Sequence, residues 1–141
     1  RRPRERPSRR AWALLALHEG SVLLQRRAPA GVWGGLYALP QFDSAAALRR
    51  AASEIDARPL LRALPPRRHA FTHFTLTLMP RRLDVRSPRP ALREDDLAWL
   101  PLAGIDSAPL PAPILALLRE IDPSAKRPAG RPPTGPRRRR A

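Results

Sequence analysis

The chain has 141 residues, contains no cysteine and carries a formal net charge of +15 at pH 7. This length corresponds to one domain with tails, and the lack of cysteine excludes disulfides, iron–sulfur clusters and thiol chemistry within the chain. No apolar run approaches the length that spans a bilayer, and residues 1–10 are charged without an apolar signal core. We therefore expect a cytoplasmic monomer with no membrane partner.

Most of the positive charge lies at the two ends of the chain. Residues 1–10 carry six arginines against Glu5, and residues 123–141 carry seven basic residues and no acidic one. Such segments attract phosphate backbones without reading a base sequence. Because nearly all the basic residues are arginine, the composition bias of a GC-rich genome is an equally simple origin. We expect an unstructured linker at 1–10 and a disordered Arg/Pro-rich tail at 123–141.

The first predicted elements are a β-hairpin and a helix. Two apolar runs, residues 11–18 and 22–25, flank a tight glycine turn, which is typical of a hairpin. Apolar residues recur at helical spacing within residues 45–55. Either Asp43 or Ser44 can cap the N-terminus of this helix.

The second half of the chain predicts further strands and a final helix. Residues 74–79 alternate in polarity, the period of a half-buried strand, which we expect Pro80 to interrupt before a continuation at 83–86. Residues 97–100 form a short strand, and Pro111 opens a helix. The apolar stripe of that helix consists of Ile114, Leu117, Leu118 and Ile121. This order predicts a mixed α/β sandwich.

Two segments have unusual compositions. In residues 31–40, Trp33 precedes two adjacent glycines, which predicts a tight turn close to another element. Trp33 and the two glycines can have a purely structural role, in the core and in a turn. Alternatively, they can place a loop near DNA. Residues 69–74 read His-Ala-Phe-Thr-His-Phe and put two aromatic rings and two imidazoles around one hydroxyl, at the junction of a loop and the long strand. Rings of this kind can stack on bases and a hydroxyl can contact a base edge, although a purely structural role is the simpler interpretation on physical grounds alone.

We expect no metal site. His69 and His73, four residues apart on a strand, share a face but lack a cysteine or a third ligand nearby. The acidic run at residues 94–96 precedes a strand, and such runs are usually solvated loops. His69 is then an orienting or packed residue, and Trp99 is expected in the core.

The segment that begins at Gly35 resembles a Nudix box from which most metal ligands are missing. The box runs Gly, five residues, Glu, seven residues, Arg-Glu, an apolar residue, any residue, Glu-Glu, any residue and Gly. The arginine of this pattern falls on Arg49 and one carboxylate on Glu54. The remaining Glu and Gly positions hold Gln41, Arg50, Ser53 and Asp56. One carboxylate beside two arginines cannot hold a hard dication at useful affinity.

The chain also resembles, over about residues 11–121, the C-terminal domain of the A/G-specific adenine DNA glycosylases, the MutY family. The matching features are Gln25-Arg26-Arg27, Pro29, Gly31-Val-Trp-Gly-Gly-Leu, Leu39-Pro40-Gln-Phe42, His69-x-Phe71-Thr72-His73-Phe74-x-Leu76, Trp99 and Leu110-Pro-Ala-Pro-Ile114. Their joint occurrence is more specific than either unusual segment alone. The resemblance implies a Nudix-like (MutT-like) mixed-sheet sandwich flanked by helices, without hydrolase activity.

The resemblance further implies a role in base excision repair. The family domain recognises 8-oxoguanine opposite adenine in double-stranded DNA through a Phe-Ser-His loop, which corresponds here to Phe71, Thr72 and His73, with Thr in place of Ser. The other candidate DNA-binding residues are His69, Trp33, Arg26 and Arg27. The chain itself is then expected to have no catalytic residue, metal or cofactor.

The resemblance also implies a partner within the same protein. An N-terminal glycosylase domain, which is missing from this sequence, carries the catalytic residues and the iron–sulfur cluster of the family. Residues 1–10 are then the end of the interdomain linker, and residues 11–122 are the lesion-recognition domain of a cytoplasmic, nucleoid-associated bacterial protein.

Two rival functions remain open at this stage. One is a divergent Nudix hydrolase of oxidised nucleoside triphosphates, against which the missing carboxylates argue. The other is a generic basic adaptor for nucleic acids, in which the charged tails account for all binding.

Overall fold

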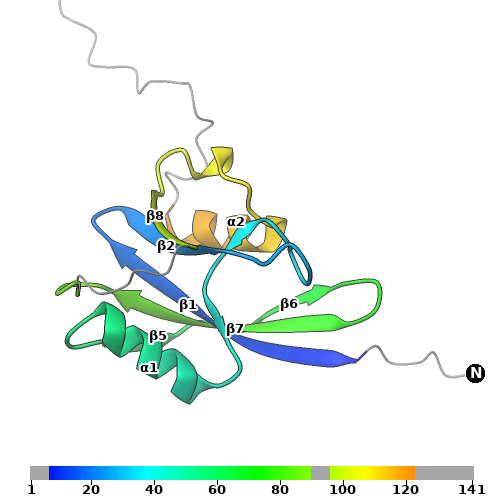
Figure 1. Cartoon of the computed structure of the whole chain (residues 1–141), viewed down its shortest axis with the longest axis horizontal. Helices are drawn as coiled ribbons and strands as arrows, with labels where there is room; N and C mark the ends of the chain where they lie inside the picture. The colour runs from blue at the N-terminus through cyan, green and yellow to red at the C-terminus, as the bar shows by residue number, and fades with distance from the viewer. Residues whose placement is uncertain (1–6, 90–95, 123–141) are drawn as a thin grey trace, which may run out of the picture.

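The computed structural model describes residues 7–89 and 96–122, which form one mixed β-sheet with a helix against each face (Figure 1). The strands are β1 (Ser8–His18), β2 (Ser21–Arg26), β3 (Tyr37–Ala38), β4 (Gln41–Phe42), β5 (Leu61–Ala63), β6 (Arg67–Ala70), β7 (Thr75–Asp84) and β8 (Leu97–Pro101). The helices are α1 (Ala45–Ile55), the short 3-10 helix η1 (Ile105–Ser107) and α2 (Ala112–Ile121). None of the helices in these two ranges has the length and apolarity that a bilayer crossing requires.

The sheet is built around β1 and β7, which run parallel to each other over ten pairs of residues. Its main path is β3-β2-β1-β7-β5, while β4 pairs with β1, β6 with β7 and β8 with β2. All pairs other than β1–β7 are antiparallel. This arrangement confirms the predicted mixed α/β sandwich.

Residues on β1 contribute to apolar cores on both faces of the sheet. Ala13 and Leu15 pack on the side of α2, and Leu14 and Ala16 pack on the side of α1. A strand that is buried on both faces has a continuous apolar sequence rather than an alternating one. The apolar run at residues 11–18 therefore reflects the central position of β1.

Three predicted elements are confirmed. The β1–β2 hairpin pairs Leu17 with Val22 across the turn. Helix α1 begins at Ala45, and its N-cap is Ser44, whose Oγ accepts the N–H of Ala47 at 3.0 Å. Helix α2 begins directly after Pro111 and buries one apolar face against the core.

The first strand begins three residues before the predicted end of the linker. Residues 8–10, assigned to the linker, are the first residues of β1, because they pair with residues 75–77 of β7. The polar composition of residues 8–10 reflects their exposure, which does not prevent them from joining a sheet. The rest of the expected linker, the expected tail and most of the acidic run at 94–96 lie outside the described residues.

The prediction that Pro80 interrupts the long strand was wrong. Strand β7 continues through Pro80, whose carbonyl accepts the N–H of Leu64 at 3.0 Å. Proline cannot donate a hydrogen bond, so within a sheet it is tolerated where no donor is needed. Pro80 meets this condition because it lies opposite the gap between β5 and β6, which pair with β7 on either side of it.

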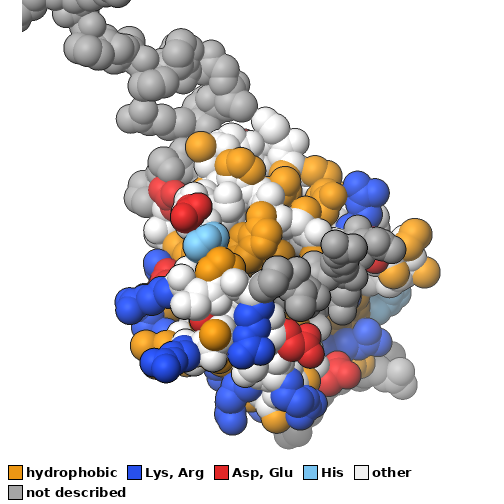
Figure 2. All heavy atoms as spheres, turned by 60° about the vertical axis from the view of Figure 1, so that its left-hand side comes forward, with side chains coloured by type: hydrophobic (Ala, Val, Ile, Leu, Met, Phe, Trp, Pro, Cys, Tyr) orange, Lys and Arg blue, Asp and Glu red, His pale blue; other side chains and the backbone are white. Residues whose placement is uncertain are grey.

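The prediction that Trp99 lies in the core was also wrong. Trp99 on β8 is 39% exposed, and its ring contacts the edge of His18 at a centroid distance of 6.0 Å. Its cross-strand partner Leu23 is buried on the α1 side of the sheet, so Trp99 points to that side at the outermost strand. Figure 2 shows the side of the molecule that carries β8, where hydrophobic side chains reach the surface and Lys and Arg side chains are interspersed with Asp and Glu.

Candidate functional site

Strands β6 and β7 form a hairpin whose turn consists of residues 71–74. The N–H of Phe71 donates to the carbonyl of Phe74 at 2.8 Å, which closes the turn and leaves Thr72 and His73 exposed at its tip. In Figure 1 this hairpin projects to the right, away from both helices. His69 therefore lies on β6 and not on the same strand as His73, which corrects the expectation that the two imidazoles share one strand.

Four rings gather at the base of this tip, and we call Trp33, His69, Phe71 and Phe74 the aromatic cluster. Phe71 and Phe74 stack at a centroid distance of 4.7 Å, and the ring of His69 stands edge-on to Phe71 at 4.6 Å. Trp33 comes from a distant loop, and its ring lies 5.7 Å from that of Phe71. All four residues are half-buried, so each keeps an exposed surface while it packs against its neighbours.

The loop that supplies Trp33 has a constrained backbone. Its ends are joined by a hydrogen bond of 2.8 Å from the N–H of Arg27 to the carbonyl of Leu36. Trp33 has a φ of 55°, a left-handed conformation that is uncommon for a bulky residue. A Cβ added to Gly34 would lie 2.2 Å from the carbonyl oxygen of Pro29, so only glycine fits there. The predicted tight turn thus holds the Trp33 ring against the hairpin.

The arginines near this region have different roles in the structure. The guanidinium group of Arg9 lies over the ring of Phe74, 4.6 Å from its centre. Arg26 stacks on Tyr37 at 5.1 Å, and the Nε of Arg27 lies 3.5 Å from the carbonyl of Val32. Arg26 is the last residue of β2, and Arg27 follows it at the start of the loop that carries Trp33.

Two positions of the degenerate Nudix box lie at a separate, small cavity of about 140 Å³. Gln41 and Glu54 line it together with apolar residues from the sheet and α1. The Nε2 atom of Gln41 is buried and has no hydrogen-bond partner within the described part of the chain. Arg50 and Ser53 are exposed on α1. Among the described residues, no group of three or more His, Cys, Asp or Glu side chains is placed to hold a metal ion.

The Gly position of the box holds Asp56, which is only 2% exposed and ends α1. Its carboxylate accepts the backbone N–H of Arg58 and that of Arg86, each at 3.0 Å. The hydrogen bond from Arg58 is the largest influence on the pKa of Asp56, and together with those from Arg86 and Ser87 it lowers this pKa below its usual value although burial acts to raise it. Asp56 thus joins the end of α1 to the segment after β7.

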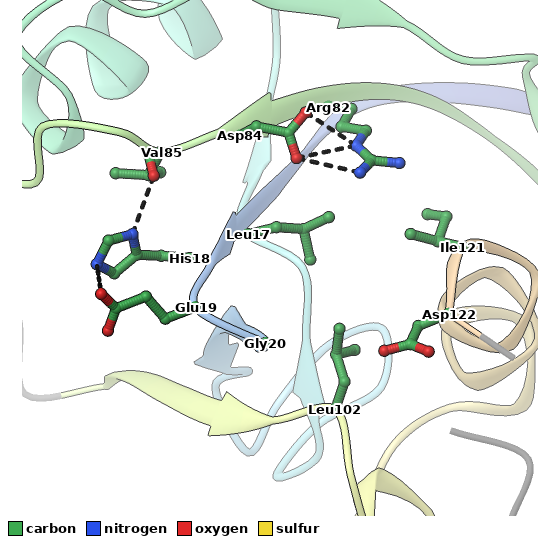
Figure 3. A pocket seen from close by; sticks show the side chains of 10 residues that line it. All are labelled: Leu17, His18, Glu19, Gly20, Arg82, Asp84, Val85, Leu102, Ile121 and Asp122. Atoms are coloured by element: carbon green, nitrogen blue, oxygen red, sulfur yellow. Dashed lines mark hydrogen bonds and ion pairs between the residues drawn. The ribbon is translucent and has the colours of Figure 1, made fainter. Parts of the chain in front are cut away.

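A larger cavity of about 330 Å³ lies at the far end of β7 from the hairpin tip (Figure 3). It is lined by the end of β1, the end of β7 and the end of α2. The ring of His18 bonds through Nδ1 to the carbonyl of Val85 at 2.9 Å, and Arg82 forms an ion pair with Asp84 at 3.1 Å. Because these polar groups already have partners within the chain, they are less available to bind a ligand than the exposed groups of the hairpin.

The domain belongs to the Nudix family, because the family model described as NUDIX domain matches residues 11–120. Three solved structures have similar folds. The C-terminal domain of mouse MUTYH, crystallised with human PCNA, has a TM-score of 0.64 and 16% identity, and the match covers 81% of this chain and 87% of that one. The NUDIX domain of Shewanella oneidensis NrtR, complexed with ADP ribose, has a TM-score of 0.61 and 16% identity, covering 81% and 86%. The MutT NUDIX hydrolase of Burkholderia pseudomallei has a TM-score of 0.57 and 20% identity, covering 81% and 98%.

The structure therefore brings together three of the candidate residues, Trp33, His69 and Phe71, and leaves two more, Thr72 and His73, exposed beside them. Sequence analysis counted Phe74 among the rings of residues 69–74 without naming it as a DNA-binding candidate, and it missed Arg9 as a member of the same surface. The spacing of Phe71 and Phe74 across two polar residues was a signal for a two-residue turn. Nothing in the sequence indicated Arg9, because its position depends on the parallel pairing of β1 with β7.

Proposed function

We propose that this Nudix domain is a non-catalytic DNA-recognition module that reads 8-oxoguanine opposite adenine and acts beside an adenine glycosylase domain of the same protein. The observation that carries the proposal is the hairpin tip, where Thr72 and His73 are exposed above the aromatic cluster. Both features are needed to read a base: rings that can stack on it and polar groups that can contact its edge.

The proposed mechanism is differential binding. The half-buried ring of Phe71 perturbs the base stack beside the lesion, supported from behind by Phe74 and Trp33. The hydroxyl of Thr72 and nearby backbone groups contact the altered edge of the base. Oxidation at C8 turns N7 of guanine from an acceptor into a donor, so a correctly placed acceptor distinguishes the lesion from guanine. A threonine hydroxyl can accept as well as donate.

Two observations support a role without hydrolysis. The residues at the Nudix box positions include Gln41, Arg50 and Ser53 in place of carboxylates, so the donor set does not fit a divalent cation. The likeness of the fold to the C-terminal domain of mouse MUTYH also agrees with the resemblance of the sequence to the MutY family. Excision of adenine, in this proposal, belongs to the partner domain.

The test is competition binding of the full chain to an 8-oxoguanine:adenine duplex and a guanine:adenine duplex at near-physiological salt. We expect tighter binding to the lesion, and we expect Phe71→Leu to weaken that binding about tenfold, as the loss of roughly 1–3 kcal/mol of stacking implies. Phe42→Leu is the matched control, because Phe42 is also half-buried but packs against the α1 side of the sheet. Equal affinity of the unsubstituted chain for both duplexes would contradict the proposal.

The same assay separates the proposal from a generic basic adaptor. If the tails supply all binding, a chain without residues 123–141 loses its affinity, and lesion and undamaged duplexes bind equally. If the hairpin reads the lesion, the shortened chain binds more weakly but keeps its preference.

A second candidate function is hydrolysis of oxidised nucleoside triphosphates. It is favoured by the cavity that Glu54 and Gln41 line, at the position where the family pattern places its metal ligands. Release of pyrophosphate from 8-oxo-dGTP, dependent on Mg²⁺ and abolished by Glu54→Gln, would establish this candidate.

A further inference from the structure

The hairpin has a second face, opposite the aromatic cluster, on which two arginines flank a threonine. Arg10 of β1 and Arg68 of β6 both pair with Thr77 of β7, one from each side. Residues directly opposite each other on neighbouring strands point to the same face of a sheet. These three side chains therefore form one row across three strands, which we call the arginine row.

Alternation along the strands separates the arginine row from the aromatic cluster. The neighbouring row consists of Arg9, Leu76 and His69, and these residues face the α2 side. Arg9 contacts Phe74 and His69 contacts Phe71, so that face belongs to the aromatic cluster. The hairpin thus presents rings on one side and guanidinium groups on the other.

No helix of the described chain covers the arginine row. Arg10 and Arg68 are both exposed, and so are Ser8 and Ala70 in the row nearer the tip. The core on this side of the sheet begins one row further in, where Trp12 packs against it. Figure 1 shows the paired ends of β1, β6 and β7 extending beyond α1. The row is therefore accessible to a ligand as large as a duplex.

The arginine row also differs from other arginines of the domain in its ion pairing. Within residues 7–89 and 96–122, no acidic side chain forms an ion pair with Arg10 or Arg68. Arg67, which precedes Arg68 and faces the opposite side, is paired with Glu120. Of these two neighbouring arginines on β6, the one that faces away from the aromatic cluster is thus the one without a carboxylate partner among the described residues.

We propose that the arginine row binds the phosphate backbone of double-stranded DNA. A guanidinium group can form two parallel hydrogen bonds to one phosphate, and a hydroxyl donates a third. Arg10 and Arg68 stand two strand spacings apart, about 10 Å, so their long side chains can converge on one phosphate or reach neighbouring ones. A hairpin that enters a groove tip first brings both faces close to the DNA, and the row then meets the backbone while the cluster meets the bases. This inference rests on the proposed DNA binding, but it needs no lesion.

The test measures how the affinity of the full chain for duplex DNA depends on salt. The logarithm of the binding constant falls as the logarithm of the salt concentration rises, and each lost phosphate contact makes this negative slope shallower by about 0.9. We expect Arg10→Gln and Arg68→Gln each to reduce the magnitude of the slope by this amount. The double variant should reduce it by about 1.8, and both effects should be the same on lesion and undamaged duplexes. Arg62→Gln is the matched control, because Arg62 is an exposed strand arginine outside the row whose cross-strand partner is Arg82; its slope should stay near that of the unsubstituted chain.

The outcomes distinguish this inference from the proposed function. If the row variants keep the slope of the control while the chain still prefers the lesion, the inference is overturned and lesion reading stands. If the slopes fall as expected while both duplexes bind equally, the row is supported and lesion reading is overturned. Circular dichroism of each variant shows whether it folds, and Arg10→Lys, which keeps the charge, should restore most of the slope.

Discussion

The β6–β7 hairpin and helix α1 belong to the same sheet sandwich, yet they present opposite kinds of surface. At the hairpin, rings and polar groups are held partly exposed by a constrained loop and a tight turn. On β4 and α1, the positions that the Nudix pattern assigns to metal ligands hold Gln41, Arg50 and Ser53 beside the single carboxylate of Glu54, and Asp56 joins backbone segments. The contrast teaches that the exposed rings and polar groups available to a ligand lie at the hairpin in this domain. They lie away from the positions at which the family pattern places its metal ligands.

The largest effect should come from Asp56, where the contrast predicts a structural role. Asp56→Asn removes one acceptor oxygen from a buried carboxylate that binds two backbone N–H groups. Hydrogen bonds to a charged group contribute about 1.5–3 kcal/mol, so we expect the free energy of unfolding to fall by about 2–3 kcal/mol in urea denaturation. Asp96→Asn, at an exposed aspartate, should change it by less than about 0.5 kcal/mol.

The pH dependence of the same variant sharpens this prediction. The pKa of Asp56 is lowered on folding, mainly by the hydrogen bond from Arg58, so its contribution to stability is fully present above the unfolded-state value of about 4. That contribution is lost as the pH falls through the lower folded-state pKa. The difference in stability between the unsubstituted chain and Asp56→Asn should therefore shrink between pH 7 and pH 3. A difference that stays constant over this range would contradict the role assigned to the ionised carboxylate.

A smaller effect, confined to the hairpin side, is expected from Gly34→Ala. The new methyl group would overlap the carbonyl of Pro29, so the loop must shift and move Trp33 away from Phe71. We expect a loss of about 1–2 kcal/mol in stability and a clear reduction in the preference for the lesion duplex. Gly20→Ala is the control, because a Cβ there meets no atom, so that only its positive φ opposes alanine, and the turn is remote from the hairpin. Equal loss of preference in both variants would show that the loop has no particular part in recognition.

The smallest effect should follow from Arg9→Gln. The cation–π contact with Phe74 is partly exposed, so its loss costs about 0.5–1 kcal/mol. We expect a two- to fivefold weaker binding to the lesion duplex by fluorescence anisotropy. Arg26→Gln, which removes a similar contact with Tyr37 outside the aromatic cluster, provides the comparison. A larger effect of Arg26→Gln would place the recognition surface on the loop rather than on the hairpin.

Much of the fold could be predicted because the long elements have strong local signals. The apolar periodicity and Ser44 defined α1, and the runs on both sides of a glycine turn defined the first hairpin. Strands β3, β4, β5 and β6 were missed because segments of two to four residues show no periodicity. The errors at Pro80 and Trp99 have a common cause: both depend on which strand lies beside the residue, and that is a property of the assembled sheet.

The candidate site was predicted from a resemblance more than from physical chemistry. The residue types around Phe71 suggested contact with bases, but on physical grounds alone a structural role was the simpler interpretation. Its contact with Trp33 joins segments that are far apart in the sequence, and no local pattern indicates it. The arginine row could not be predicted at all, because it requires the register of β1 and β6 on the two sides of β7.

The turn of the β6–β7 hairpin contributes two exposed side chains, Thr72 and His73, that belong to no strand and to neither apolar core. Both are mounted at the end of β7, whose ten-residue pairing with β1 is the longest ladder of the domain. Side chains on such a rigid support can be exchanged without rebuilding the scaffold. Libraries randomised at these two positions alone should therefore yield folded proteins, and under the proposed function, selection on duplexes with other modified bases should change which base the domain binds.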